Sequence, residues 1–422
     1  MNTSNSLLPA DPSDASALHA RAPFWSPRRH LQRLLGSLRC GSLLVQLPDG
    51  QVLAQRGRID GPRAELHLHR WRALRRLLLQ GDIGLAESYR DGDWSTPDLM
   101  ALLDFGLRND GAWGAALRGS RLARLMARIH HLRNANTRNG SRRNIAAHYD
   151  LGNDFYAAWL DSRLIYSSAL YAPGDSTLEQ AQVRKLARVA QLLDLQPGQR
   201  VLEIGCGWGG LAVELAREHG VQLTGVTLSR EQLAHARAQV AQAGLQDAVE
   251  LRLQDYRELQ GRFERIVSIE MLEAVGETYW PVYFDTLRER LAPGGCAVLQ
   301  VILIDDRYFA TYRKSADFIQ RHVFPGGLLP CDAAVREQAA RAGFRIERTD
   351  RFGASYARTL LEWRERFEAA WPRLQAQGFD EAFRRLWRYY LCYCEAGFRA
   401  RRVDVALYRL RHATPQAGTA DT

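Results

Sequence analysis

The segment "VLEIGCGWGG", residues 201–210, limits the folds open to this chain more than any other. An apolar run that ends with the acidic Glu203 is followed by four glycines within six positions. A strand that turns through glycines into a helix lets a nucleotide lie close to the backbone. Gly205, Gly207 and Gly210 also match the spacing G-x-G-x-x-G of dinucleotide sites. The segment therefore predicts a nucleotide-binding α/β fold and leaves the nucleotide open.

Strands and helices alternate from about residue 145 onward, which predicts a parallel, doubly wound sheet. The helix candidates lie at 209–220, 230–245 and 279–295. After Ile304 the alternation stops. A long insertion at 305–330 is followed by aromatic segments that we expect to be helical. The strand candidates are the apolar runs at 200–205, 222–228, 249–255, 265–271 and 296–303.

A small α+β domain is expected before that sheet. Two strands around the turn "PDG" and a third at 64–70 precede an amphipathic helix at 70–82. Residues 84–94 are expected to form a loop, followed by a helix capped by Ser95 or Thr96 with Pro97 at its first position. The expected division is a disordered leader at 1–20, this domain at 21–120, a basic helical linker at 121–144 with a hinge at 134–144, a catalytic domain at 145–414 and a disordered tail at 415–422.

The formal net charge of +10 belongs to the first third of the chain. Residues 1–144 contain 22 arginines, no lysine and 12 acidic residues, whereas residues 145–422 contain 35 basic and 35 acidic residues. Two interpretations remain open. The arginines form a solvated surface, or they form a patch that faces a polyanion such as nucleic acid or an anionic lipid surface. Lys185 and Lys314 are the only lysines in the sequence.

Composition excludes several classes of protein. No window approaches 18 apolar residues, so we expect no membrane-spanning helix. The first 20 residues lack the pattern of a secretory signal. The six cysteines are scattered without a CxxC pair, so we expect neither a disulfide framework nor a metal site. A reducing cytoplasm is the expected compartment.

Residues on neighbouring strands favour S-adenosylmethionine (SAM) as the nucleotide. A dinucleotide site needs an acid about 20 residues after the glycines, at the end of the second strand. That strand ends in "GVTLS" and has no carboxylate. Glu203, just before the glycines, would hold the amino-acid end of SAM. Asp255 and Tyr256 in "LQDYRE" would bind adenine, so these residues predict a SAM site rather than a nicotinamide or flavin site.

Nine segments in order resemble the cyclopropane-fatty-acyl-phospholipid synthases and the related mycolic acid cyclopropane synthases. The resemblance covers residues 40–412, and "GLAESYRDGDW" resembles the accessory N-terminal domain of the phospholipid enzymes. The nine segments are "HYDLGNDFY", "YSSALY", "VLEIGCGWGG", "GVTLSREQ", "LQDYRE", "IEMLEAVG", "FIQRHVFPGG", "FGASYARTLLEW" and "YYLCYCEAGFR".

The resemblance implies a fold, a reaction and a set of residues. The fold is a SAM-dependent methyltransferase sheet, and the reaction adds the SAM methyl to a cis double bond of a phospholipid acyl chain. A carbocation forms, and loss of a proton to a bound bicarbonate closes a cyclopropane ring. The implied bicarbonate ligands are Ser168, Glu273, Gln300 with the backbone of Ile302, and Tyr356, and Cys394 matches a cysteine traditionally assigned to the active site. The implied SAM ligands are Tyr166, Ser167, Glu203, Gly205, Cys206, Gly207, Gly209, Thr227, Gln232, Asp255 and Tyr256.

Two positions depart from the best-known members of that family. Ser168 stands where cysteine is usual, and Gln300 stands where histidine is usual. Both can donate hydrogen bonds to an anion, but neither titrates near neutral pH. The remaining candidate for moving a proton is Glu273. The departures leave a second outcome open, a C-methyltransferase that produces a methyl-branched acyl chain.

Other residue types in the catalytic domain suit a cationic intermediate. Glu270 and Glu273 follow the fourth strand, where open α/β sheets place their ligands. Aromatic rings, which stabilise cations, are frequent in the last helices. The reaction needs no covalent enzyme intermediate, so Cys394 has a packing role as its alternative.

A lipid substrate gives the basic N-terminal region an expected partner. We expect unsaturated phospholipids at the inner face of the membrane, where each arginine near anionic headgroups contributes about 1 kcal/mol. The expected location is cytoplasmic and peripheral to the membrane, nucleic acid is not an expected partner, and a homodimer is open. A nucleic-acid methyltransferase and a SAM-binding regulator are the alternatives from other classes.

Overall fold

The computed structural model describes residues 26–117, 140, 151–175, 177–314 and 316–413. Apart from residue 140, the predicted leader at 1–20, the linker at 121–144 with its hinge and the tail at 415–422 lie outside the described residues.

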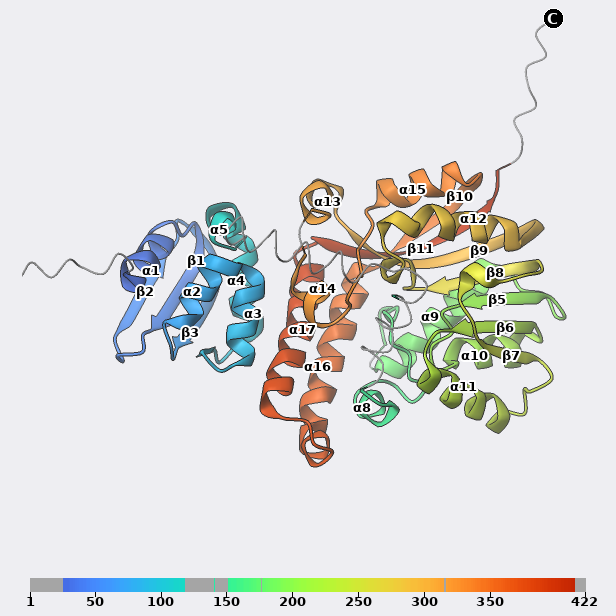
Figure 1. Cartoon of the computed structure of the whole chain (residues 1–422), viewed down its shortest axis with the longest axis horizontal. Coiled ribbons are helices and arrows are strands. Elements are labelled where there is room, and N and C mark those ends of the chain that lie inside the picture. Colours follow the sequence, from blue (N-terminus) through green and yellow to red (C-terminus); the bar gives the residue numbers. More distant parts are fainter. Residues whose placement is uncertain (1–25, 118–139, 141–150, 176, 315, 414–422) are drawn as a thin grey trace, which may run out of the picture.

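A seven-stranded sheet forms the centre of the catalytic part (Figure 1), in the order β10-β11-β9-β8-β5-β6-β7. Its five strands from β7 to β9 are parallel and coincide with the five predicted strands, so that prediction is confirmed. Their bounds are β5 Arg200–Ile204, β6 Gln222–Thr227, β7 Val249–Leu253, β8 Phe263–Ile269 and β9 Leu291–Ile304.

The expectation of only helices after Ile304 is wrong. β10 (Phe344–Arg351) and β11 (Val403–His412) extend the sheet, and β11 pairs antiparallel with both β9 and β10. The sheet is therefore mixed rather than wholly parallel. β11 reads "VDVALYRLRH", and its middle residues 405–408 are buried on both sides because β11 lies inside the sheet. Such a strand lacks the alternation of a half-buried strand, so its sequence pattern does not distinguish it from a buried helix segment.

Helices cover both faces of this sheet. Helices α9 (Leu178–Leu193), α10 (Gly210–His219) and α11 (Arg230–Gln242) form one layer, and α12 (Trp280–Arg290) and α15 (Asp332–Arg341) form the other. On β5, Val201 belongs to the apolar cluster of the first layer and its neighbour Leu202 to the cluster of the second. Successive residues of a strand point to opposite faces, so β5 is buried between two cores.

The N-terminal part is built on a four-stranded sheet in the order β2-β1-β3-β4. The three predicted strands are confirmed there as β1 (Cys40–Gln46), β2 (Val52–Arg56) and β3 (Ile59–Leu68), and β4 is Trp94–Ser95. The helices of this part are α1 (Pro27–Gly36), α2 (Arg72–Gln80), α3 (Asp82–Arg90), α4 (Leu99–Arg108) and α5 (Asp110–Leu117).

Two local predictions in the N-terminal part are wrong. Most of the expected loop at 84–94 belongs to α3, because Gly81, with φ of 70°, ends α2 and lets a second helix start at once. Helix α4 is capped by Asp98 rather than by Ser95 or Thr96. The Asp98 carboxylate accepts a hydrogen bond of 3.0 Å from the backbone N–H of Ala101, which is the usual bond of an acidic N-cap.

A helical hairpin joins the two parts of the molecule (Figure 1). Helices α16 (Gly353–Ala376) and α17 (Glu381–Arg399) pack against each other, and α17 also packs against α3 and α4. The insertion contains α13 (Asp306–Tyr312) and α14 (Phe318–His322), and α8 (Asn153–Ala157) precedes the sheet. Within the described residues, no helix is both long and apolar enough to cross a bilayer.

Candidate active site

One cavity of about 1580 Å³ runs from the glycine turn after β5, past the carboxyl ends of β8 and β9, and on between the helices and the sheet of the N-terminal part. Ligands of open α/β sheets bind at the carboxyl ends of the strands, so the first half of this cavity is where the fold predicts chemistry.

The glycine turn forms one wall of the cavity. Gly205, Gly207 and Gly209 have φ of 84°, 53° and 87°, values that side chains disfavour. Gly205 and Gly207 line the cavity, and a Cβ atom on Gly207 would meet no atom within 4 Å. A Cβ on Gly209 would instead lie 3.0 Å from the Cβ of Ala236 on α11. Gly207 thus leaves room for a ligand, whereas Gly209 lets α10 and α11 approach.

Polar groups from the second and third strands complete that wall. Thr227 Oγ1 donates a hydrogen bond of 2.9 Å to Oε1 of Gln232, and both residues line the cavity. The Asp255 carboxylate is held by Arg257 through two bonds of 2.8 and 2.6 Å. The buried hydroxyl of Tyr256 has no hydrogen-bond partner among the described residues. The glycine backbone, the amide of Gln232 and this hydroxyl fit the parts of SAM.

Four predicted SAM ligands lie behind the cavity wall rather than on it: Ser167, Glu203, Cys206 and Gly209. Tyr166 is on the wall, and its hydroxyl lies 2.9 Å from that of Tyr390. Ser167 and Glu203 face a residue that our sequence analysis did not assign to the site, Lys185 on α9.

Lys185 is a buried cation next to the site. Its Nζ donates a hydrogen bond of 2.9 Å to Ser167 Oγ, and only 1% of the residue is exposed. Burial lowers the pKa of Lys185. The nearby carboxylates of Glu270, Asp161 and Glu203 oppose this decrease. Burial also raises the pKa of Glu203, and Lys185 opposes that rise. The rarity of lysine in this chain was the one signal that could have singled it out.

Glu270 is the centre of the reaction side of the cavity. It has φ of 49°, an uncommon value for a side chain other than glycine, and stands directly after β8. Its Oε1 accepts hydrogen bonds from the backbone N–H of Ser168 at 2.9 Å and from Gln300 Nε2 at 2.7 Å. Its Oε2 accepts one of 2.7 Å from the Tyr356 hydroxyl. Three of the residues expected around bicarbonate therefore converge on a carboxylate of the chain itself.

Glu273 lies on the cavity wall near Glu270. One of its oxygens accepts a hydrogen bond from the backbone N–H of Ile302, and the other is buried without a partner among the described residues. Burial, followed by the charge of Glu270, raises the pKa of Glu273 to about 8. A group with such a pKa is mostly protonated near neutral pH and ionises as the pH rises toward about 8; in the ionised form, its free oxygen is suited to accept a proton.

This arrangement does not fit a bound bicarbonate. The Tyr356 hydroxyl, the Gln300 amide and the Ile302 N–H already donate to Glu270 or Glu273, and the Ser168 hydroxyl donates to the Ala169 carbonyl at 2.9 Å. An added anion would also face two carboxyl groups. We therefore derive no step through bicarbonate.

Cys394 lines the cavity on α17, beside the aromatic residues Tyr390, Tyr393 and Phe324. Burial raises the pKa of its thiol far above the usual value, so the thiol stays protonated and is a poor nucleophile. Among the described residues, no group of three or more His, Cys, Asp or Glu side chains is arranged to hold a metal ion.

Known proteins match both the sequence and the fold. The family model for mycolic acid cyclopropane synthetase matches residues 136–408. The tuberculostearic acid methyltransferase UfaA1 of Mycobacterium tuberculosis is 39% identical over 374 residues, which are 84% of this chain and 85% of that protein. The cyclopropane-fatty-acyl-phospholipid synthase of Escherichia coli is 38% identical over 340 residues, 80% of this chain and 84% of that protein.

Solved structures of the same kind superimpose on the catalytic part. The cyclopropane synthase MmaA2 of Mycobacterium tuberculosis matches with a TM-score of 0.60 at 31% identity, over 64% of this chain and 97% of that one. The mycolic acid cyclopropane synthase CmaA1, solved as a complex with SAH and CTAB, matches with a TM-score of 0.60 at 30% identity, also over 64% of this chain and 97% of that one. The predicted methyltransferase fold is confirmed.

Proposed function

This chain belongs to the mycolic acid cyclopropane synthetase family of SAM-dependent methyltransferases, and from that premise we propose that it methylates a cis double bond in an acyl chain of a membrane phospholipid. The position of Glu270 between Ser168, Gln300 and Tyr356 carries the more specific part of the proposal, which concerns the product.

SAM, when bound, supplies an electrophilic methyl group. The π electrons of the double bond form the new C–C bond, the C–S bond breaks with its electrons going to sulfur, and the other alkene carbon becomes a cation. Loss of one proton from the substrate then completes the reaction. The residues of this chain hold the reactants, exclude water and accept that proton.

The charge and hydrogen bonds of the site favour Glu273 as the proton acceptor. Burial raises the pKa of Glu270, and the three hydrogen-bond donors oppose that rise and fix the position of the carboxyl group in the cavity. Glu273 has a free buried oxygen and a pKa raised to about 8 by burial. Tyr166, Phe324 and Tyr390 also line this part of the cavity, and their ring faces stabilise positive charge.

The fate of the cation depends on which hydrogen the base removes. The donors that the family resemblance assigns to a ring-closing bicarbonate are bound to Glu270 and Glu273 here. The relative that is 39% identical is named a methyltransferase rather than a cyclopropane synthase. These observations support a methyl-branched, still unsaturated product. Ring closure is the second candidate, supported by the family model and the Escherichia coli relative.

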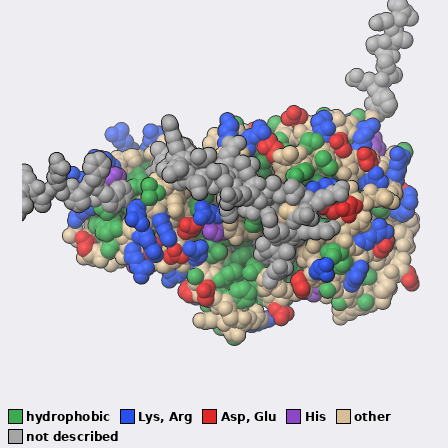
Figure 2. All heavy atoms as spheres, viewed as in Figure 1, with side chains coloured by type: hydrophobic (Ala, Val, Ile, Leu, Met, Phe, Trp, Pro, Cys, Tyr) green, Lys and Arg blue, Asp and Glu red, His purple; other side chains and the backbone are tan. Residues whose placement is uncertain are grey.

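Membrane docking is the proposed role of the basic sequence next to the catalytic part. On the described N-terminal part, basic and acidic side chains lie side by side (Figure 2). Arg72 and Arg76 of α2 pair with Asp93 and Asp91, which follow α3, at 2.8 and 2.7 Å. Residues 118–144 contain eight arginines and no acid.

We expect the binding of anionic vesicles to depend on these eight arginines and to weaken as the salt concentration rises. Replacing them by glutamine and measuring co-sedimentation with anionic vesicles tests this, and retention by nucleic acid instead would overturn it.

The product decides between the two outcomes of the reaction. The enzyme is incubated with SAM and vesicles of a cis-unsaturated phospholipid, and the released acyl chains are analysed by mass spectrometry and proton NMR. Both products gain one CH2, so mass alone does not separate them. A methyl or methylene group on an alkene carbon supports branching, and shielded ring protons with loss of the vinyl signals support ring closure. No mass gain would overturn the proposed substrate.

A further inference from the structure

The cavity of about 1580 Å³ continues past the glycine turn and the carboxyl ends of β8 and β9 into the N-terminal part, whose residues line its far end. Its far end is an arm inside the N-terminal part, which we call the leucine arm. The arm is lined from α1, β1, β3, α2 and α4, among others by Leu34, Leu43, Leu66, Leu74, Leu102 and Phe105.

The leucine arm is a hollow in what would otherwise be the core of the N-terminal part. Leu43, Leu74 and Phe105 belong to the apolar cluster of that part, yet all three border the cavity. Protein interiors are packed to the density of crystals, and few voids in them exceed the size of a water molecule. An apolar hollow of this extent offers water almost no hydrogen-bond partners, so it suits a hydrocarbon ligand.

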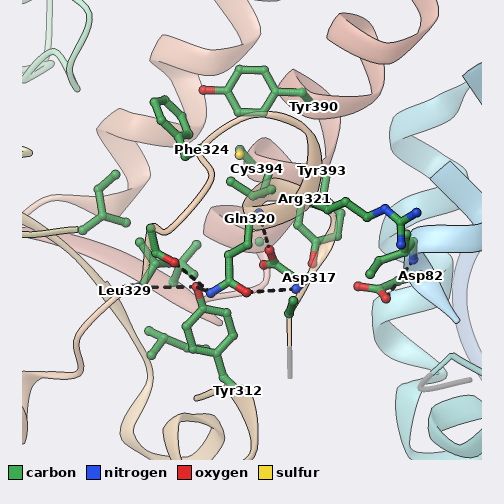
Figure 3. A pocket seen from close by; sticks show the side chains of 18 of the residues that line it. Asp82, Tyr312, Asp317, Gln320, Arg321, Phe324, Leu329, Tyr390, Tyr393 and Cys394 are labelled. Atoms are coloured by element: carbon green, nitrogen blue, oxygen red, sulfur yellow. Dashed lines mark hydrogen bonds between the residues drawn. The ribbon is translucent and has the colours of Figure 1, made fainter. Parts of the chain in front are cut away.

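A polar neck separates the leucine arm from the reaction side. Figure 3 shows Asp82 at the boundary with the N-terminal helices, Arg321 extending toward it, and Asp317, Gln320 and Tyr312 on the catalytic side. Burial raises the pKa of Asp82 to about 7 and that of Asp317 to about 6, so near neutral pH the neck carries less negative charge than its acids would suggest.

The neck also reaches solvent. Lys314 and Thr311 on the catalytic side and Leu79 and Gln80 on the N-terminal side line the cavity and are exposed. Across the same boundary, Glu87 forms an ion pair of 3.2 Å with Arg321 and lies 3.2 Å from His322 Nε2. These contacts hold the two halves of the cavity together.

The cavity therefore has two apolar arms that diverge from one polar, solvent-accessible point. We propose that it binds a lipid with two hydrocarbon chains, with the unsaturated chain in the reaction arm and the second chain in the leucine arm. A diacyl phospholipid has the same distribution of polarity, because its two chains diverge from one polar glycerol. The inference rests on the proposed function for the reacting chain. It adds that the N-terminal part, which lies before the family match at residues 136–408, selects diacyl over single-chain substrates.

Two neighbouring leucines on β1 provide a matched pair of variants. Leu43 is buried and lines the arm, whereas Leu44 points to the other face of the strand, is 37% exposed and does not line the cavity. Leu43→Trp fills the arm and Leu44→Trp is the control. Leu66→Phe is a smaller filling variant, to be used if thermal unfolding shows that Leu43→Trp is not folded.

The substrates are 1-palmitoyl-2-oleoyl-phosphatidylglycerol and oleoyl-lysophosphatidylglycerol, each in mixed micelles with SAM, and the readout is the rate of SAH release. We expect Leu43→Trp to lower kcat/KM for the diacyl lipid at least tenfold and to change that for the single-chain lipid less than twofold. Leu44→Trp should change neither. An equal loss with both lipids, or no loss with either, would overturn the two-chain proposal.

A second measurement does not depend on turnover. A diacyl lipid with a photoreactive diazirine at the end of its saturated chain is bound to the SAH-loaded enzyme. The complex is irradiated, and the labelled peptides are then identified. Labels on α1, β1 or α2 support the proposal, and labels confined to the catalytic part contradict it. If neither lipid is turned over while SAM still binds, the proposed function fails, and this labelling still decides the second chain.

Discussion

Tyr356, near the start of α16, donates a hydrogen bond of 2.7 Å to Oε2 of Glu270, which follows β8 and lies 86 residues earlier in the sequence. The bond joins the sheet to the helical hairpin at the point where the cavity passes both residues. A hydrogen bond to a charged group contributes about 1.5–3 kcal/mol. The pair thus connects the position of a buried carboxylate to the packing of α16.

Loss of this bond should slow the reaction. Tyr356→Phe removes one of the three donors to Glu270, and we expect kcat to fall about 10- to 100-fold. Tyr408→Phe is the matched control, because that hydroxyl donates to the carboxylate of Asp332 and Tyr408 does not line the cavity. Steady-state kinetics and thermal unfolding of both variants separate the two effects. Equal losses of kcat in both would contradict a specific role for Tyr356.

Glu273 should make the folded protein less stable as the pH rises. Its pKa is about 8 in the folded protein, raised by burial from an ordinary value of 4.5. The stability linked to its protonated form is complete below pH 4.5 and is lost as the pH rises to about 8, at up to about 1.4 kcal/mol per pH unit. We expect Glu273→Gln to gain about 1 to 3 kcal/mol over the wild type between pH 5 and pH 8 in urea unfolding. Glu289→Gln, at an exposed residue, is the control and should show no such gain.

Lys185 and Glu203 should depend on each other for stability. Lys185→Met removes the buried ammonium and leaves Ser167 and Glu203 without it, which we expect to cost about 1–3 kcal/mol. Adding Glu203→Gln should restore part of that loss, since an uncompensated carboxylate is removed at the same time. Urea unfolding of the two single variants and the double variant measures the coupling. Simple additivity of the two losses would show that the side chains do not interact.

Gln232 should contribute directly to SAM affinity. Its buried amide is on the cavity wall and is held by Thr227. Gln232→Ala removes about one hydrogen bond, so we expect the Kd for SAM in calorimetry to rise about tenfold. Gln242→Ala, at the exposed end of the same helix, should leave the Kd unchanged. A Kd within twofold of the wild type for both variants would remove Gln232 from the SAM site.

Cys394 should be dispensable for chemistry. Burial keeps its thiol protonated, and the proposed reaction forms no bond to it. We therefore expect Cys394→Ala to retain kcat within about threefold of the wild type, whereas Glu273→Gln should lose about 100-fold or more. Rates of SAH release under saturating lipid provide the comparison. A loss in Cys394→Ala as large as that in Glu273→Gln would establish the cysteine as catalytic.

Much of the catalytic fold follows from local sequence patterns. The five parallel strands and the helices between them were predictable because hydrophobic runs and glycine turns act over a few residues. β11 could not be predicted in this way, because an interior strand is recognised only when its neighbours β9 and β10 are known. α3 could not be predicted for a different reason: it begins directly after Gly81, the single residue that ends α2, so no loop in the sequence separates the two helices.

The sequence by itself determined the nucleotide-binding turn at Gly205 and Gly207, the pair Asp255 and Tyr256, and membership of a lipid-modifying methyltransferase family. Those features are contiguous in the chain, so their chemistry can be recognised without coordinates. Only the tertiary structure decided that Ser168, Gln300 and Tyr356 all bind Glu270, because these contacts join residues that are 102, 30 and 86 positions apart in the sequence. The leucine arm is also a tertiary feature, since a cavity depends on how close the packed elements come and not on the residues of any one of them.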